Sequence, residues 1–523
     1  MPLYLGLDAS TQSLTAVVIE MAGDRRRLVF ESSLRFDDAM PAYGTRNGVL
    51  PASDPSVATS PPLMWAEALD RMMALVAESV EVHQIAAVSG SAQQHGSVYW
   101  NSQAGHALAS LDPARPLAAQ LGQSLSRSVS PIWMDSSTSA ECAEITAAVG
   151  GDAALADKTG SRAFERFTGP QIRRFSKQHP AAYEATARID LVSSFHASLL
   201  MGGHAPVDPG DASGMNLMDL TTNQWWPDAL RATAPGLKAK LPPIVASSSM
   251  AGTLAPYWRI RYGFAPADVV AWSGDNPCSL IGLGLINEKQ LAISLGTSDT
   301  VFGPMDVPRV DPGGTGHVFG APTGAFMGLT CFQNGSLARE RIRDEHSMSW
   351  SDFSHALERT PPGNHGGLML PWFGPEITPR VAHAGARRRE LPPGDAKRNV
   401  RAVVEGQCMS MAIHSRWMGV EVETIHATGG ASRNMQVLQV IADVFGAGVY
   451  RQEVSNSAAL GAALRAAHAA MNAAGAAVRW ADVIAGFCDP TAAAPLQPRP
   501  EAHAVYRELI RRYAAFEALA LTQ

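Results

Sequence analysis

The chain has 523 residues, which is more than a single hydrophobic core usually serves, so roughly two to four domains are expected. Its formal net charge is -6 and charged residues make up 17%, which argues against a nucleic-acid or anionic-membrane binder, because such proteins cluster Lys and Arg on one surface. No run of about 18 apolar residues is present, so no transmembrane helix is predicted.

The N-terminal part is predicted to begin with a β-meander. Apolar runs and their periodicity predict strands at 3–8, 15–20 and 27–32, a helix at 63–80 and a strand at 85–89. The first two strands are joined by a hydroxyl-rich turn, Ala9 to Ser13. The segment 36–62 is polar, rich in Pro and long enough to be a functional loop.

The same order of elements recurs in the second half of the chain. We predict strands at 291–295, 299–303 and 325–330, helices at 336–343 and 399–418, a strand at 424–428, a helix at 434–445, a strand at 449–453 and helices at 458–470 and 502–521. Two copies of a meander, helix, strand, helix order imply two related α/β lobes with a central cleft.

Between these copies, the stretch 269–300 combines a short apolar strand, an acidic pair, a helix and a Gly-Thr-Ser turn. The simplest interpretation is structural: Asn276 caps a helix whose first residue is Pro277. The alternative is catalytic, because a carboxylate at Asp275 and a phosphate-sized loop at 296–298 are what a kinase acting on a hydroxyl would need. No Walker A sequence or protein-kinase motif set occurs in the chain.

Seven loops, taken in chain order, resemble those of the FGGY carbohydrate kinases, most closely the D-xylulose kinases of the longer type found in animals and some bacteria. Any one of these loops alone is weak evidence for the family, whereas the whole set in this order is specific and covers nearly the whole chain. They are LDASTQ at 7–12, SAQQHG at 91–96, WMDSST at 133–138, DASG at 211–214, SGDN at 273–276, SLGTS at 294–298 and TGGAS at 428–432.

The resemblance implies an α/β fold of the actin/hexokinase/Hsp70 type, built from two duplicated ribonuclease-H-like lobes. It places a sugar-binding lobe at 1–284 and a nucleotide-binding lobe at 285–523. It implies ATP-dependent phosphorylation of the terminal hydroxyl of D-xylulose, with Asp275 as the general base. A carboxylate has an ordinary pKa near 4, so at neutral pH it is ready to accept a proton.

For the nucleotide, the resemblance implies ATP with Mg²⁺. Asp8, at the end of the first strand, is the predicted metal ligand. The chain has Ala9 where the family more often has Gly, so a less close approach of the backbone to phosphate is expected. The predicted nucleotide-binding residues are Ser10, Thr11, Gln12, Gly296, Thr297, Ser298, Trp350, Gly429, Gly430 and Asn434.

For the sugar, Gln94 and His95 follow a strand end, and their side chains can bridge adjacent hydroxyls. The resemblance implies that Arg166, Asp275 and Asn276 also bind the sugar. Asp211 and Asp135 are secondary candidates. Two alternatives stay open: a family member acting on ribulose, a pentitol or another polyol, and a non-catalytic sugar or nucleotide sensor on the same scaffold.

The remaining predictions concern partners and location. Five widely spaced cysteines without a CxxC pair, and an N-terminus without a basic or cleavable leader, favour a reducing, cytoplasmic location. The expected partners are the sugar and ATP, with neither nucleic acid nor membrane, and a homodimer is left open.

Overall fold

The computed structural model describes residues 1–23, 25–452, 456–490 and 494–522 and divides into two compact units. Unit 1 comprises Met1–Ile286, Phe319–Phe326 and Ser455–Asp489, and unit 2 comprises Asn287–Val318, Met327–Val454 and Pro490–Gln523. In the described part of the chain, no helix combines the length and the apolar character needed to cross a membrane.

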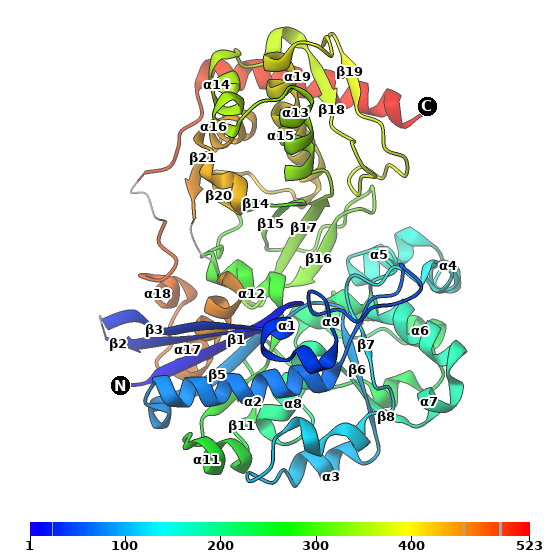
Figure 1. The fold of residues 1–523 in the computed structure, drawn as a ribbon, viewed down its shortest axis with the longest axis vertical. Coiled ribbons are helices and arrows are strands. Elements are labelled where there is room, and N and C mark those ends of the chain that lie inside the picture. Colours follow the sequence, from blue (N-terminus) through cyan, green and yellow to red (C-terminus); the bar gives the residue numbers. More distant parts are fainter. Residues whose placement is uncertain (24, 453–455, 491–493, 523) are drawn as a thin grey trace. The chain divides into compact units, whose positions relative to one another are not determined.

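Unit 1 is built on a mixed sheet with the strand order β11-β12-β5-β1-β2-β3 (Figure 1). Its strands are β1 (Leu3–Ala9), β2 (Ser13–Ala22), β3 (Arg25–Arg35), β5 (Ile85–Ala92), β11 (Met250–Thr253) and β12 (Asp268–Val270). β1 pairs antiparallel with β2 and parallel with β5. This arrangement confirms the predicted N-terminal meander, and β5 extends beyond its predicted end to Ala92.

Two layers of helices cover this sheet. Helix α2 (Pro62–Ser79) packs its apolar side, including Met64, Trp65 and Leu69, into a core that also contains Leu5 and Leu7 of β1. Because side chains alternate along a strand, the intervening Gly6 faces the other side, where helix α17 (Ser457–Ala473) lies against β1 and β5. Figure 1 shows this orange helix beside the blue N-terminal strands.

The other described elements of unit 1 follow strand β5. They are β6 (Ser97–Asn101), α3 (Ala104–Ala109), β7 (Ser130–Pro131), α4 (Ser139–Ala148), α5 (Asp152–Thr159), α6 (Thr168–Gln178), α7 (Pro180–Glu184), β8 (Thr186–Leu191), α8 (Val192–Met201), α9 (Pro209–Ala212), β9 (Met218–Asp219), β10 (Gln224–Trp225), α10 (Pro227–Thr233), α11 (Pro256–Tyr262), β13 (Ser273–Gly274), α12 (Asp275–Gly282) and α18 (Trp480–Ile484). The segment 36–62 is mostly irregular, with only α1 (Phe36–Ala39), a short 3-10 turn and β4 (Thr59–Ser60).

Unit 2 contains a second sheet, in which β17, β15, β14, β20 and β21 are neighbours in that order. Its described elements are β14 (Gln290–Leu295), β15 (Asp299–Met305), β17 (Phe326–Phe332), α13 (Ser336–Glu345), α14 (Trp350–Arg359), β18 (Leu368–Leu370), β19 (Arg387–Arg389), α15 (Ala396–His414), β20 (Thr424–Thr428), α16 (Met435–Phe445), β21 (Gly448–Arg451) and α19 (Pro500–Leu521). Strand β16 (His317–Gly320) continues this sheet beyond β17.

The two sheets confirm the predicted duplication. In each, a strand pairs antiparallel with the next strand in sequence and parallel with a later one: β1 with β2 and β5, and β14 with β15 and β20. A further parallel strand follows, β12 beside β5 and β21 beside β20. The last residue of the strand predicted at 449–453 lies outside the described residues.

The helix that follows Asp275 differs from the prediction. It begins at Asp275 itself, with Gly274 as its N-cap residue, so Asn276 does not cap it and Pro277 is not its first residue. The Asn276 side chain instead donates to Asp275 Oδ1 and to Gln94 Oε1, whereas a capping side chain would accept from a backbone N–H of the first turn. The capping interpretation of this stretch is therefore wrong.

Candidate active site

The acidic part of the site lies at two strand ends of unit 1. Asp8 is at the end of β1, where its Oδ1 accepts a hydrogen bond of 2.7 Å from Ser91 Oγ of the parallel strand β5. Burial raises the pKa of Asp8 to about 6. The pKa of Asp275 is raised to about 7, first by burial and then by the negative charge of Asp8.

These two carboxylates suit a divalent cation. Burial raises the pKa of both carboxyl groups, and the negative charge of Asp8 adds to the rise at Asp275. Mg²⁺ prefers oxygen ligands and is commonly held by one or two carboxylates together with water and phosphate oxygens. Asp8 can therefore hold such an ion, and its charge would offset the repulsion that Asp275 experiences.

Asp275 and Asn276 are fixed by a chain of side-chain hydrogen bonds. Asn276 Nδ2 donates to Asp275 Oδ1 at 3.0 Å and lies 2.9 Å from Gln94 Oε1, to which it also donates. Gln94 Nε2 in turn donates to the carbonyl of Gly210 at 3.2 Å. Both ends of the Gln94 amide are thus engaged within the protein, which makes Gln94 a support for Asn276.

His95 is a neutral hydrogen-bond acceptor. Its Nδ1 lies 2.7 Å from the carbonyl oxygen of Gly214, which can only accept, so Nδ1 carries the proton. Burial and the nearby charge of Arg166 lower the pKa of His95 to about 3, so the other ring nitrogen is unprotonated. The ring stacks on Phe167 with centroids 4.3 Å apart, which fixes its orientation.

Arg166 belongs to an aromatic cluster beside His95. Its guanidinium carbon lies 5.0 Å from the centre of the Phe164 ring and 5.6 Å from that of Phe167. Both rings are buried and therefore hold the guanidinium close to the imidazole. Both phenylalanines lie within two residues of Arg166 along the chain, and only the stack of Phe167 on His95 joins segments that are distant in sequence.

The secondary candidates Asp211 and Asp135 have structural contacts. Asp211 is buried and accepts from Ser193 Oγ, and burial with the charges of Asp208 and Asp275 raises its pKa well above the usual range. Asp135 accepts from the backbone N–H of Ala58 at 3.0 Å and from Gln171 Nε2 at 2.7 Å. Asp135 therefore joins loops together.

The turn at 10–12 connects β1 to β2, as predicted. Ser10 donates its backbone N–H to the carbonyl of Ser13 at 2.9 Å, and its hydroxyl also contacts Ser13. Thr11 Oγ1 accepts a hydrogen bond of 2.7 Å from Trp133 Nε1. The turn therefore follows directly after the end of β1, the strand that carries Asp8.

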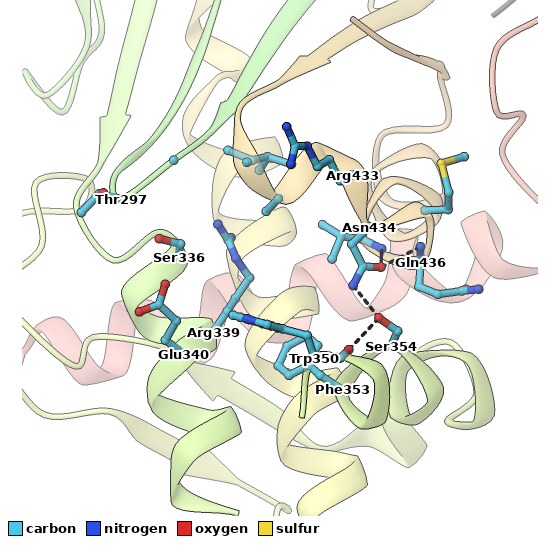
Figure 2. A pocket seen from close by; sticks show the side chains of 16 residues that line it. Thr297, Ser336, Arg339, Glu340, Trp350, Phe353, Ser354, Arg433, Asn434 and Gln436 are labelled. Atoms are coloured by element: carbon cyan, nitrogen blue, oxygen red, sulfur yellow. Dashed lines mark hydrogen bonds between the residues drawn. The ribbon is translucent and has the colours of Figure 1, made fainter. Parts of the chain in front are cut away.

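Unit 2 contains a cavity of about 720 Å³, a size that suits a small ligand (Figure 2). Five of the predicted nucleotide-binding residues line it: Gly296, Thr297, Trp350, Gly430 and Asn434. Ser298 and Gly429 are not among the lining residues. Gly429 instead has a φ of +84° and approaches Leu295 so closely that a Cβ would lie 2.6 Å from its carbonyl oxygen.

Two sides of this cavity are fixed by hydrogen bonds. Asn434 Oδ1 caps helix α16 by accepting from the N–H of Gln436 at 3.0 Å, while its Nδ2 donates to Ser354 Oγ at 2.9 Å. Ser354 Oγ donates to the carbonyl of Trp350 at 3.0 Å, so one chain of bonds joins α14 to α16 (Figure 2). The sequence did not suggest Ser354, which is distant from Asn434 along the chain.

Trp350 presents a large apolar surface to this cavity. Its side chain is 45% exposed although it starts a capped helix, and the Arg343 guanidinium lies 4.6 Å from its ring centre. On the Gly296–Thr297 side, the buried Arg339 makes a bidentate ion pair with Asp299, at 2.8 and 3.1 Å. That pair anchors the residue that follows the Gly-Thr-Ser turn.

Comparisons with known proteins agree with this arrangement. Two family models match the chain, the N-terminal domain of the FGGY family of carbohydrate kinases at residues 121–282 and its C-terminal domain at residues 291–470. A xylulose kinase of Mus musculus is 45% identical over 98% of this chain and 93% of its own length. Xylulose kinase 2 of Arabidopsis thaliana is 43% identical over 89% of this chain and 87% of its own length.

Solved structures share the fold. A ligand-bound xylulose kinase from Lactobacillus acidophilus superposes with a TM-score of 0.82 at 19% identity, covering 99% of each chain. A xylulose kinase from Rhodospirillum rubrum gives a TM-score of 0.82 at 18% identity, covering 99% of this chain and 98% of its own. The predicted two-domain α/β fold of the actin/hexokinase type is thereby confirmed.

Proposed function

Because the chain belongs to the FGGY family of carbohydrate kinases, we propose that it transfers phosphate from ATP to the terminal hydroxyl of D-xylulose, giving D-xylulose 5-phosphate and ADP. The substrate rests on full-length relatives that are named xylulose kinases. The single structural observation that carries the proposal is the connected group in unit 1, in which Asp275, Asn276 and Gln94 are joined by hydrogen bonds.

In this proposal Asp275 is the general base. Its carboxylate accepts the proton of the sugar hydroxyl as that oxygen attacks phosphorus, and a pKa near 7 suits a base that must accept a proton and then release it at neutral pH. Asn276 orients the carboxylate through two hydrogen bonds to Oδ1, which leaves Oδ2 for the hydroxyl.

His95 and Arg166 recognise the other sugar oxygens. The unprotonated ring nitrogen of His95 accepts a hydrogen bond from a sugar hydroxyl, because Nδ1 is committed to Gly214. The Arg166 guanidinium can only donate and so binds an oxygen lone pair. The two residues thus recognise opposite hydrogen-bonding properties of a polyhydroxylated ligand.

The nucleotide residues form the second part of the proposal. Asp8 is the residue proposed to hold Mg²⁺, which would neutralise phosphate charge when bound with ATP. The indole of Trp350 offers an exposed ring for stacking on the adenine base, and Gly430 permits close approach of the ligand to the backbone. In unit 1, the turn at 10–12 is proposed to supply hydroxyl and N–H donors for phosphate oxygens. In unit 2, Thr297 is proposed to supply a hydroxyl donor to the nucleotide.

The division of the chain into a sugar-binding domain at 1–284 and a nucleotide-binding domain at 285–523 is likewise a proposal. It is supported by the break between the two matched family segments, which falls between residues 282 and 291. The compact units interleave in sequence, because α17 returns to the sheet of unit 1. A cytoplasmic location and a homodimer stay predictions.

A substrate panel tests the proposal. ADP release is measured with MgATP and each of D-xylulose, D-ribulose, xylitol and glycerol, and D-xylulose is expected to give the highest kcat/KM. A preference for ribulose or a polyol would instead identify another activity of the same family. If ADP release did not depend on any of these acceptors, or if no ADP were released with any of them, the result would contradict the kinase assignment and favour a sensor.

A further inference from the structure

The loop 36–62, which the sequence singled out but the proposed chemistry does not use, lies against the turn at 10–12. At its start, Phe36 donates its backbone N–H to the carbonyl of Gln12 at 2.9 Å. The loop then returns to the same turn at Gly48. A Cβ atom added to Gly48 would lie 1.9 Å from the carbonyl oxygen of Thr11. The loop therefore touches the turn on consecutive residues.

Asn47 and Gly48 form the tip of a small hairpin. Arg46 and Val49 exchange backbone hydrogen bonds of 2.8 and 3.1 Å, and the two residues between them have φ angles of +53° and +77°. Positive φ at both central positions and the Asn-Gly sequence are typical of a type I′ turn. This geometry places the Cα of Gly48, with no side chain, directly on Thr11.

The hairpin tip is held in place from within the loop. Asp37 accepts hydrogen bonds from Thr45 Oγ1 at 2.7 Å, from the N–H of Gly48 at 3.1 Å and from the N–H of Asn47. These bonds outweigh partial burial and hold the pKa of Asp37 below its ordinary value. Ser60, which is fully buried, donates its hydroxyl to the carbonyl of Gly48 at 2.7 Å.

Thr11 is held a second time by the segment around Trp133. The indole N–H donates to Thr11 Oγ1 at 2.7 Å. This segment is joined to the loop through the antiparallel pair β4–β7 and through Asp135, which accepts from the N–H of Ala58 at 3.0 Å. One connected layer therefore contacts both the main-chain carbonyl and the hydroxyl of Thr11.

We infer that the Asn47-Gly48 tip, which we call the 47–48 clamp, is a positioning element for phosphoryl transfer. It fixes the Thr11–Gln12 backbone, and with it the strand end that carries Asp8, in the geometry that receives the phosphate. The inference rests on the proposed function for its catalytic meaning. The clamp touches no reacting atom, so Gly48 and Asp37 are positioning residues.

A glycine pair within the loop provides a matched test. Gly44 has a φ of +70° and nothing within 4 Å of its Cβ position, whereas Gly48 has a φ of +77° and meets Thr11. Alanine at either position carries a similar backbone strain, but only Gly48→Ala must displace Thr11 or lift the hairpin tip. Displacements of about 1 Å in a catalytic group can cost roughly 100-fold in rate.

The first measurement is steady-state kinetics with MgATP and D-xylulose. Gly48→Ala is expected to lower kcat at least 10-fold relative to Gly44→Ala, with KM for D-xylulose changed less than 3-fold, because the sugar residues are not touched. Equal kcat values in the two variants would overturn the inference.

A second pair guards against misfolding of Gly48→Ala. Asp37→Ala removes the anchor of the tip without adding an atom, and the exposed neighbour Asp38→Ala serves as its control. Asp37→Ala is expected to lower kcat several-fold while Asp38→Ala stays within 2-fold of the wild type. An unchanged kcat in Asp37→Ala would count against the clamp.

Hydrogen exchange separates the inference from the proposed function. Amides of residues 8–14 are expected to exchange at least 10-fold faster in Gly48→Ala than in Gly44→Ala, whichever sugar the protein phosphorylates. A wild type inactive on every acceptor would refute the proposed function, whereas the exchange result would still decide whether the clamp orders the turn. Equal exchange in both variants would refute the clamp.

Discussion

At the scale of single residues, the most informative feature is the pair of carboxylates at two strand ends of unit 1. Burial raises the pKa of Asp8 to about 6, and burial together with the charge of Asp8 raises that of Asp275 to about 7. The environment that would suit Asp275 to the proposed role of general base at neutral pH also makes its charge costly to the folded protein. In the proposed mechanism, catalytic use and stability are therefore opposed at this residue.

Asp275→Asn is expected to show both effects. Without a base, kcat should fall by about 100-fold or more, while binding of sugar and nucleotide persists. In metal-free protein, the folded-state pKa of Asp275 lies above its unfolded value, so its protonation stabilises the fold fully below about pH 4, and this contribution is lost as the pH rises to about 7. The variant should therefore gain stability relative to the wild type as the pH rises.

The size of this gain can be measured by urea unfolding at pH 5 and pH 8. The difference in unfolding free energy between Asp275→Asn and the wild type should increase by about 1–3 kcal/mol over that interval. The exposed Asp38→Asn serves as the control for loss of one carboxylate. A difference that stays constant with pH, or near-normal turnover of the variant, would refute the role assigned to Asp275.

Sequence reasoning identified most of these residues but not their supports. Asp275, Asn276 and His95 stand in short motifs that can be recognised along the chain. The hydrogen bond of Ser91 to Asp8 and the stacking of Phe167 on His95 could not be predicted, because each joins residues that are distant in sequence. Gln94 was predicted to bind the sugar, whereas both ends of its amide bond protein atoms.

At the scale of elements, the crossing of α12 and α17 fixes the helix that carries Asp275. A Cβ on Gly461 of α17 would lie 1.9 Å from the carbonyl oxygen of Cys278, and one on Gly282 of α12 would lie 1.9 Å from that of Ser457. The two backbones are thus in direct contact, which only glycine allows at these positions. The buried Arg465 of α17 also donates to the carbonyls of Gly90 and Ala271.

Gly461→Ala is expected to destabilise the protein, because the added methyl group meets backbone atoms that cannot rotate away. A loss of about 1–3 kcal/mol in unfolding free energy is expected from such overpacking. Gly105→Ala is the matched control: it lies in helix α3 with nothing within 4 Å of its Cβ position and should stabilise by about 0.5–1 kcal/mol. Equal effects in thermal unfolding would contradict the proposed close contact.

Element positions were largely predictable, whereas their contacts were not. The helices α2 and α19 and the strands β1, β2, β14 and β20 begin and end within a few residues of their predicted limits, because each has a strong periodic pattern. The docking of α17 onto the first sheet has no such signature. Its alanines and glycines predict a helix but no particular partner. Only the structure shows that the backbone of Ala459 and Ala463 packs against Gly6 of β1.

At the scale of the whole molecule, duplication explains how one chain can bind two unlike ligands. The two sheets share the antiparallel and parallel pairing of their central strands, and different side chains lie at the ends of these strands. Unit 1 has carboxylates, an amide network and a neutral histidine at these ends. Unit 2 has a cavity of about 720 Å³ with an exposed indole. The proposed assignment of sugar to unit 1 and nucleotide to unit 2 follows from this contrast.

Two single variants should separate the two binding functions in calorimetric titrations. Trp350→Ala should weaken ADP binding about 10-fold, since base stacking on an aromatic ring contributes about 1–3 kcal/mol, and should leave D-xylulose binding unchanged. Arg166→Ala should weaken D-xylulose binding about 10-fold or more, because hydrogen bonds to a charged group contribute about 1.5–3 kcal/mol, and should leave ADP binding unchanged. Arg166→Lys keeps the charge but loses the planar group, so only partial recovery is expected. If either variant weakened the binding of both ligands equally, or if Trp350→Ala weakened only sugar binding, the proposed separation of sugar binding in unit 1 from nucleotide binding in unit 2 would be refuted.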